Sequence, residues 1–337
     1  MDSGARMSTC PVCGSQNGTI LYSVDSDTAA RRFSEGSEKN WAQEARSAIE
    51  LTWGQQTCDY VRCPQCTFAY ADPFVAATPD FYAALYESGA EYAEWKWEFQ
   101  RTFEALALLK AAGRLPPFAL LDIGAGTGRF ASRILDRVAG CRGLLCTEYS
   151  EYGRNEIAAR GMRCVRGGLS DVDMQEYRSA FDVLCLFQVL EHMDDLESVF
   201  SRLSHLARDK GHLFIAVPNH AQRAYFDRWG FHEDMPPVHI GRWTRQSLEV
   251  VASRHGWRLE EDEIEAECYL SKLRRLAVQY ARGSSAFEAL GSVRSRGVRR
   301  TLRAVLVAVF LITSFPAAYG LRSASLGSAY WAHLSKV

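Results

Sequence analysis

An acidic residue and three glycines stand close together near the middle of the chain. The apolar run 118–121 leads into Asp122, and the glycines follow at every second position: Gly124, Gly126 and Gly128. Apolar residues recur at helical spacing from Phe130 onward, so the segment is predicted to be a strand, a tight turn and the start of a helix. Glycine is needed where the backbone takes a positive φ or approaches a ligand closely. A dinucleotide fingerprint would need its third glycine at Arg129, so the pattern departs from that fingerprint.

A second acidic residue, Glu148, ends the next predicted strand, 144–148. It follows the turn by about 20 residues, where nucleotide-binding α/β folds carry an acid for the ribose. One carboxylate can accept hydrogen bonds from both ribose hydroxyls. Two further apolar stretches, 181–187 and 211–219, are predicted to be later strands of the same sheet.

These segments, in this order, resemble the core of class I S-adenosylmethionine-dependent methyltransferases. The resemblance covers roughly residues 81–260 and implies a doubly wound α/β fold with a seven-stranded sheet, whose last strand, within 327–337, lies antiparallel beside the fifth. It implies S-adenosylmethionine as the cofactor. The residues then expected to contact this cofactor are Asp122, Gly124, Ala125, Gly126, Gly128, Glu148, Tyr149, Leu169, Gln188 and Tyr86.

For two of these residues, Leu169 and Tyr86, a second interpretation stays open. Leu169 stands where many relatives have an acid that bonds to the adenine amine, so adenine selection is expected to depend on backbone and apolar contacts, with Asp171 as a weaker candidate. Tyr86 belongs to a tyrosine-rich segment that covers the cofactor in the resembled proteins. The alternative is that its aromatic residues pack the N-terminal part of the chain onto the core.

Two Cys-x-x-Cys pairs occur in the N-terminal part of the chain: Cys10, Cys13, Cys63 and Cys66. This spacing lets two thiolates from a tight turn reach one tetrahedral ion, so the pairs predict a zinc site, with unlinked surface thiols as the alternative. Four thiolates leave no open position for a reacting water, so the zinc is expected to be structural. Between the pairs, 29–40 is expected to be exposed and 41–49 to be a short helix. Methyltransferases of the resembled class with such a zinc ribbon often act on sugars or natural products.

Two histidines are candidates for a general base, because imidazole titrates near neutral pH. His239 follows Pro236 and Pro237, which stiffen its loop, and it is the preferred base. His192 follows the fourth predicted strand and is the second candidate. For both, a structural role is the alternative: shaping the pocket, or bonding to the backbone as a buried imidazole. No spacing among His220, His232 and His239 indicates a zinc site.

The composition of the chain limits the kinds of partner and location that can be expected for it. The chain has 337 residues, 47% of them hydrophobic and 23% charged, which is ordinary for a soluble globular protein. Its net charge of −1 argues against nucleic acid, which a basic excess would favour. Residues 1–8 lack the apolar core of a signal peptide, so a cytoplasmic location is expected. In that reducing compartment the ten cysteines are expected to be metal ligands or packing residues.

The balance of charge changes toward the C-terminus. Arginines and Lys272 dominate 272–303, where Glu288 is the single acid, and 304–321 carries no charge. A basic segment beside an apolar one suits the anionic inner face of a membrane, so peripheral contact through 272–321 is one expectation. The alternative is a pair of helices that covers the sheet or forms a dimer contact.

The expected organisation is a zinc-ribbon-like subdomain (1–75), a lid and linking helix (76–112), a methyltransferase core (113–267), a basic and apolar helical extension (268–326) and the final core strand (327–337). The expected activity is methylation of a hydroxyl on a sugar, glycan or natural product, with a lipid-linked acceptor as one form. Two alternatives stay open: a protein or RNA methyltransferase, and a non-catalytic module that binds the cofactor and partners.

Overall fold

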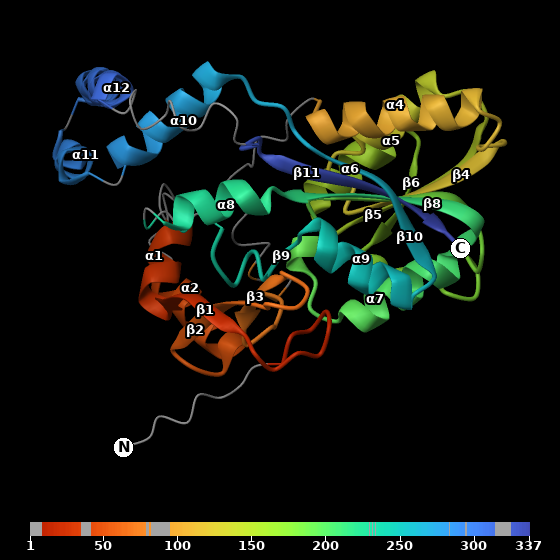
Figure 1. Ribbon diagram of the computed structural model, residues 1–337. Coiled ribbons are helices and arrows are strands. Elements are labelled where there is room, and N and C mark those ends of the chain that lie inside the picture. Colours follow the sequence, from red (N-terminus) through yellow and green to blue (C-terminus); the bar gives the residue numbers. More distant parts are fainter. Residues whose placement is uncertain are drawn as a thin grey trace. The chain divides into compact units, whose positions relative to one another are not determined.

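The computed structural model describes residues 9–34, 42–78, 81, 95–228, 230, 232, 234–282, 284–293, 295–313 and 325–337. The chain folds into two compact units (Figure 1). The first comprises Met1–Pro218, Asp234–Glu263 and Ala329–Val337. The second comprises Asn219–Glu233 and Ile264–Ser328, and so contains most of the expected extension 268–326.

The larger sheet of the first unit has seven strands within the described residues. In spatial order they are β10 (Trp257–Ile264), β11 (Ala329–Lys336), β8 (Ala207–Pro218), β7 (Phe181–Phe187), β4 (Phe118–Ile123), β5 (Cys141–Glu148) and β6 (Arg163–Arg166). Strands β8, β7, β4, β5 and β6 are paired in parallel, and β11 is antiparallel to β8, with Ala329 opposite Pro218. The predicted seven-stranded doubly wound sheet is confirmed.

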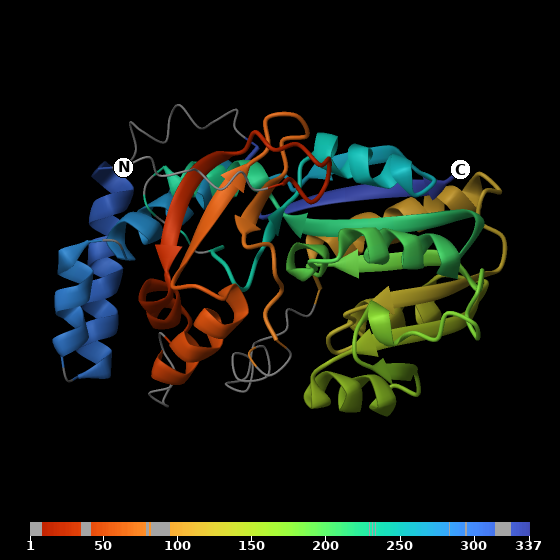
Figure 2. The same cartoon turned by 90° about the horizontal axis from the view of Figure 1, so that it is seen from below.

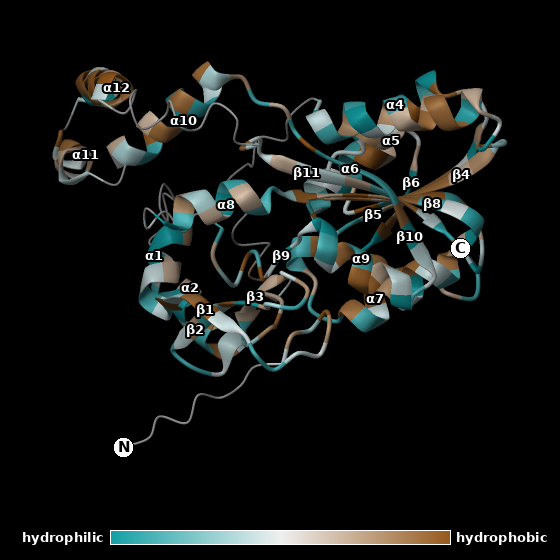
Figure 3. Ribbon diagram, in the orientation of Figure 1, coloured by the Kyte–Doolittle hydropathy of each residue, from teal (hydrophilic) through white to brown (hydrophobic). Residues whose placement is uncertain are grey.

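Helices cover both faces of this sheet, which explains why its central strands are apolar on both sides. On one face lie α4 (Trp97–Ala111), α5 (Arg129–Arg137) and α6 (Glu151–Ala159), and on the other α7 (Leu196–Leu206) and α9 (Arg245–Arg254) (Figure 1). Strands β4 and β7 are almost wholly buried, and β4 is coloured largely as hydrophobic in Figure 3. Parallel strands of this kind end at one edge of the sheet, where α/β folds bind their ligands.

A smaller sheet forms in the N-terminal part of the same unit (Figure 2). Its strands are β1 (Thr19–Asp25), β2 (Thr57–Arg62), β3 (Ala69–Asp72) and β9 (Gly241–Arg242), in that order. Helices α1 (Ser26–Ser34) and α2 (Ala42–Trp53) share a buried cluster with β2 that includes Ala29, Ile49 and Tyr60. The expectation that 29–40 is exposed is therefore wrong for Ala29 and Ala30, which are both buried because α1 packs through these small side chains.

The smaller sheet is joined to the larger one through the segment before β9. The N–H of Ala71, in β3, donates to the carbonyl of Ile240 (2.9 Å). The N–H of Ile240 in turn donates to the carbonyl of Glu191 (2.9 Å), which follows β7. The side-chain hydroxyls of Thr67 and Thr244 also bond to each other (2.6 Å). The loop that contains His239 is thus held between the two sheets.

The second unit is helical. It contains α8 (His220–Asp227), α10 (Tyr269–Arg282), α11 (Ser285–Ala289), the 3₁₀ turn η3 (Leu290–Ser292) and α12 (Arg296–Thr313). Phe226, Leu273 and Leu276 form a buried cluster, and Leu311 of α12 packs against it. Within the described residues, none of the helices combines the length and apolarity needed to cross a membrane.

Candidate functional site

The glycine turn lies between β4 and α5, at the carboxyl edge of the larger sheet. Gly124, Gly126 and Gly128 all have positive φ, of 66°, 56° and 70°. A Cβ on Gly124 would lie 2.6 Å from Cγ2 of Val189. Position 124 is therefore restricted to glycine, both by its backbone conformation and by the close contact with Val189. The N–H of Ala125 is fixed by the carbonyl of Thr147 (2.9 Å), which ties the turn to β5.

Two carboxylates lie beside this turn. Glu148, at the end of β5, accepts from the N–H groups of Gly126 (2.8 Å) and Ser150 (2.7 Å). Asp122, at the end of β4, is 2% exposed. Burial, and then the nearby charge of Glu148, raise the pKa of Asp122 to about 8. The structure thus places both predicted acids at one edge of the sheet, and their contact with a cofactor stays a prediction.

Gln188, predicted to contact the cofactor, has an unusual backbone. Its φ is +59°, a left-handed conformation that costs a non-glycine residue roughly 1–3 kcal/mol. Its N–H donates to the carbonyl of Ala216 (2.7 Å), and its side-chain amide lies 3.4 Å from a carboxylate oxygen of Glu98 on α4. Strain of this kind is concentrated at functional sites. Sequence reasoning missed Glu98, which is buried although it comes from a helix outside the motif.

The remaining predicted cofactor contacts are placed as follows. Tyr149 directly follows Glu148 and is 57% exposed. Its phenol packs against Gly168, where an added Cβ would lie 2.7 Å from the phenol oxygen. Leu169 begins the 3₁₀ turn η1 (Leu169–Asp171), and its side chain is buried. Asp171 accepts from the N–H of Gly168 (2.8 Å). Tyr86 lies outside the described residues.

The two candidate bases meet in the folded chain. The rings of His192 and His239 are 4.6 Å apart between centroids, at 76°. Nδ1 of His192 bonds to the carbonyl of Val238 (2.6 Å), and Nδ1 of His239 bonds to the carboxylate of Asp234. Burial, and then the charge of His239, lower the pKa of His192 to about 3, so His192 is neutral at ordinary pH. The Asp234–His239 pair has the arrangement of an oriented base.

Three residues near these histidines were not predicted as site residues: Glu191, Asp234 and Arg242. Glu191 is completely buried, and burial raises its pKa to about 7, with the charge of His239 acting in the opposite direction. The carboxylate of Asp234 contacts two side chains: one oxygen bonds to His239, and the other, Oδ2, lies 3.6 Å from Nε of Arg242. Nothing in the local sequence marks Asp234 as the partner of His239; the folded loop brings the two together. His232 of the second unit bonds instead to Asp227 (3.1 Å).

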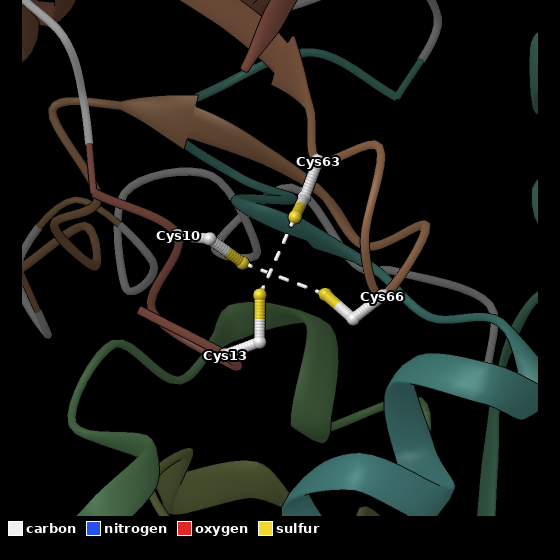
Figure 4. A group of neighbouring side chains, drawn as sticks. All are labelled: Cys10, Cys13, Cys63 and Cys66. Atoms are coloured by element: carbon white, nitrogen blue, oxygen red, sulfur yellow. Dashed lines mark hydrogen bonds between the residues drawn. The ribbon is translucent and has the colours of Figure 1, made fainter. Parts of the chain in front are cut away.

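The four cysteines of the two Cys-x-x-Cys pairs point toward a common centre (Figure 4). Their Sγ atoms all lie within 4.8 Å of one another. Cys10 and Cys66 are separated by 3.5 Å, and Cys13 and Cys63 by 3.4 Å. With Zn–S bonds of about 2.3 Å, tetrahedral geometry requires sulfur atoms about 3.8 Å apart. The thiols therefore fit a tetrahedral ion of this size, whereas a disulfide would need about 2.0 Å.

The parallel sheet with its antiparallel β11, and the glycine turn and acids at its carboxyl edge, define a class I methyltransferase fold. A methyltransferase domain family matches residues 94–262, which is half of the chain. The chain therefore belongs to the methyltransferase domain family.

Curated relatives are distant. The chain is 22% identical over 146 residues to a ubiquinone biosynthesis O-methyltransferase of Photorhabdus laumondii, covering 38% of this chain and 58% of that protein. It is 27% identical over 116 residues to one of Sinorhizobium medicae, covering 34% and 47%. The chain thus spans about half the length of the curated relatives that it matches.

The chain is also similar to solved methyltransferase structures. One is the 1,6-didemethyltoxoflavin-N1-methyltransferase of Burkholderia thailandensis, which contains S-adenosylhomocysteine (15% identity, TM-score 0.45, covering 83% of this chain and 95% of that one). Another is an S-adenosylmethionine-dependent methyltransferase of Archaeoglobus fulgidus (15%, TM-score 0.43, covering 76% and 100%).

Proposed function

We propose that the chain transfers a methyl group from S-adenosylmethionine to a hydroxyl oxygen of a small molecule. The observation that carries this proposal is the placement of two sets of groups in one unit. The glycine turn and the acids Asp122 and Glu148 occupy the carboxyl ends of β4 and β5. His192 follows the adjacent strand β7, and its N–H donates to the carbonyl of Val189 (3.1 Å), whose side chain packs on Gly124. The ring of His239 packs against that of His192.

The residues present fit the cofactor. Glu148 keeps lone pairs for donors such as the ribose hydroxyls, since each of its oxygens accepts one backbone N–H. Buried Asp122 becomes an acceptor for a cationic or donor group when it loses its proton, and such a ligand favours that loss. When bound, S-adenosylmethionine supplies an electrophilic methyl group. The chain's own contribution is then to orient the acceptor and to remove its proton.

His239 is the proposed base. The carboxylate of Asp234 accepts from Nδ1–H of His239, which leaves Nε2 to take a proton from the acceptor hydroxyl. Asp234 also stabilises the imidazolium that forms. His192, whose pKa lies near 3, is proposed to shape the pocket rather than to exchange protons.

The acceptor is proposed to be a sugar, glycan or natural-product hydroxyl. The names of the curated relatives support oxygen as the methylated atom, although they match at low identity and over part of their length. Zinc bound by Cys10, Cys13, Cys63 and Cys66 is proposed to stabilise the smaller sheet, because four thiolates leave no position for a substrate.

The test begins with calorimetric titration of the zinc-loaded chain with S-adenosylmethionine, followed by transfer of labelled methyl groups to nucleotide sugars, lipid-linked glycans and phenols. We expect His239→Ala to lower turnover at least tenfold with unchanged cofactor affinity, and Glu148→Ala to lower cofactor affinity. Equal loss of cofactor affinity in His239→Ala would exclude its role as a base. Methylation of protein or RNA instead would change the acceptor class, and failure to bind the cofactor would favour a partner-binding module.

We also propose that α12 contacts an anionic membrane surface. Five of its apolar side chains are at least 40% exposed, at alternating spacings of four and three: Val298, Leu302, Val305, Val309 and Ile312. This spacing places them on one face of the helix. The same helix carries arginines at 299, 300 and 303, and Figure 3 shows its hydrophobic colouring. An apolar face with adjacent cations is typical of helices that lie at a membrane surface.

Sedimentation with vesicles tests the membrane contact. We expect the chain to sediment with vesicles that contain phosphatidylglycerol and to remain in solution with phosphatidylcholine alone. Leu302→Glu combined with Val305→Glu should abolish sedimentation, whereas Leu51→Glu, on the exposed side of α2, should not. If the unaltered chain ignores anionic vesicles and light scattering shows a dimer that Leu302→Glu and Val305→Glu dissolve, the face is a contact between copies.

A further inference from the structure

The carboxylate of Glu191 is the most unusual polar group of the first unit. Its residue is 0% exposed, and among the described residues neither Oε1 nor Oε2 has a hydrogen-bond partner. Burying an ionised carboxylate without hydrogen bonds or a paired charge costs several kcal/mol. A buried carboxylate of this kind needs another interaction to offset the cost of its burial, and a bound cation can provide it.

Two imidazoles lie next to this carboxylate. Nε2 of His192 is 4.0 Å from Oε1 of Glu191. One donor atom each from Glu191, His192 and His239 can be chosen so that all lie within 4.8 Å of one another. Ligand atoms bound about 2.1 Å from one cation are separated by about 3 Å when adjacent and about 4.2 Å when opposite. Side-chain shifts of up to about 1 Å by each partner therefore bring the three donor atoms to adjacent positions around one cation.

Hydrogen bonds orient both rings as a metal requires. The carbonyl of Val238 can only accept, so Nδ1 of His192 must be the donor in that 2.6 Å bond. The carboxylate of Asp234 likewise accepts from Nδ1–H of His239. Each ring therefore carries its lone pair on Nε2. Metal-bound histidines usually donate their second N–H to a carbonyl or a carboxylate in this way.

We propose that Glu191, His192 and His239 form a binding site for a divalent cation of the first transition row. Two imidazoles and one carboxylate suit Mn²⁺, Fe²⁺, Co²⁺ or Zn²⁺ better than they suit Ca²⁺. Three protein ligands leave open positions, unlike the closed set of four cysteines. The site is thus chemically distinct from the zinc site of the smaller sheet.

The role of this cation in catalysis rests on the proposed function, whereas the cation site itself does not. An acceptor hydroxyl bound at an open position loses its proton more readily, because the cation stabilises the alkoxide. The O–H bond breaks, the proton passes to water, and the oxygen keeps the electron pair that attacks the methyl group. As the O–C bond forms, the bond from the methyl carbon to the donor's sulfur would break, and the sulfur would keep that electron pair. In the metal-loaded chain this replaces the role of His239 as the base: Nε2 of His239 is then a ligand, and turnover rises with added metal, which it would not if His239 removed the proton itself.

The test uses the full chain loaded with one equivalent of Zn²⁺, which the four thiolates bind more tightly than two imidazoles and a carboxylate do. This chain is titrated directly with Mn²⁺, and electron paramagnetic resonance measures the free ion. Thiolates hold Zn²⁺ far better than Mn²⁺, so the cysteine site does not take up the probe. We expect one Mn²⁺ per chain and at least tenfold weaker binding in Glu191→Gln and His239→Asn. Asp234→Asn should weaken binding about tenfold, since Asp234 orients a ligand. His232→Asn is the matched control and should bind as the unaltered chain does.

Circular dichroism and the zinc content of each variant show whether it has folded, and Glu191→Gln keeps the shape of the buried side chain. No Mn²⁺ binding by the unaltered chain up to millimolar concentration, or equal binding by Glu191→Gln, would overturn the proposal. The Mn²⁺ titration contains no S-adenosylmethionine, so its result is independent of the calorimetric titration with the cofactor. A chain that binds Mn²⁺ but not S-adenosylmethionine would refute the methyl-transfer function and leave the cation site standing.

Discussion

Replacing Asp122 by Asn should stabilise the free protein at alkaline pH while weakening cofactor binding. The pKa of Asp122 rises from 3.8 to about 8 in the folded state, chiefly because the residue is buried. Below pH 4 the acid is protonated in both the folded and the unfolded chain, so it has no effect on stability. Between these two pKa values the unfolded chain loses the proton and the folded chain keeps it, so stability falls as pH rises and levels off above pH 8.

The size of the effect follows from the pH interval. Each pH unit within it costs about 1.4 kcal/mol, so going from pH 5 to pH 8 removes about 4 kcal/mol that Asp122→Asn does not lose. Burying the amide of the Asp122→Asn variant has its own energetic cost, but this cost is the same at pH 5 and pH 8. It therefore cancels when the change in stability between the two pH values is compared. Urea unfolding at pH 5 and pH 8, followed by tryptophan fluorescence, measures it. Asp136→Asn, at an exposed position of α5, is the control and should show no such difference.

The same slope of stability against pH for Asp122→Asn and the unaltered chain would refute the reasoning, because burial would then not hold a proton on Asp122. A slope of opposite sign would mean that the carboxylate is ionised and hydrogen-bonded in the folded chain. Cofactor binding measured on the same samples separates the two roles of the residue. A variant that is more stable and binds less tightly is the expected outcome.

Further predictions concern the zinc site and the glycine turn. Cys63→Ser should reduce the zinc content, measured by atomic absorption, and lower the melting temperature; an unchanged zinc content would mean that the four thiols do not act together. Gly124→Ala should destabilise the chain by about 2–4 kcal/mol and weaken cofactor binding, because its Cβ would lie 2.6 Å from Val189 and its φ is positive. Gly161→Ala, with φ of +72° and nothing within 4 Å of its Cβ, should cost only about 1–2 kcal/mol and leave cofactor affinity unchanged.

The central strands could be located from the sequence because parallel strands buried on both faces read as continuous apolar runs. Their arrangement in the sheet was predicted from the resemblance to class I methyltransferases. The cysteine site could be predicted because its ligands come in pairs with fixed local spacing. Helix α1 was missed because it packs through Ala29 and Ala30, and alanine gives little hydrophobic signal. The expected contact of Tyr86 with the cofactor lies outside the described residues and stays a prediction.

The surroundings of His239 could not be predicted as a whole, because they are assembled from distant parts of the chain. Glu191 follows β7, Asp234 precedes the double proline, and Arg242 belongs to β9 of the smaller sheet. Each is an ordinary polar residue in the sequence. Their contacts depend on β9 pairing with β3, which no local pattern of two residues could indicate.

Through the hydrogen bonds of Ile240, the smaller sheet is expected to influence the rate of the proposed reaction. Its carbonyl bonds to Ala71 of β3, the strand that follows Cys66, while its N–H bonds to Glu191, beside both histidines. The glycine turn is held by separate bonds to Thr147 and Glu148 of β5. Loss of zinc would therefore shift His239 before it disturbs the cofactor residues. A zinc-starved cell would then accumulate a chain that still captures its methyl donor but turns over slowly, and so sequesters the donor.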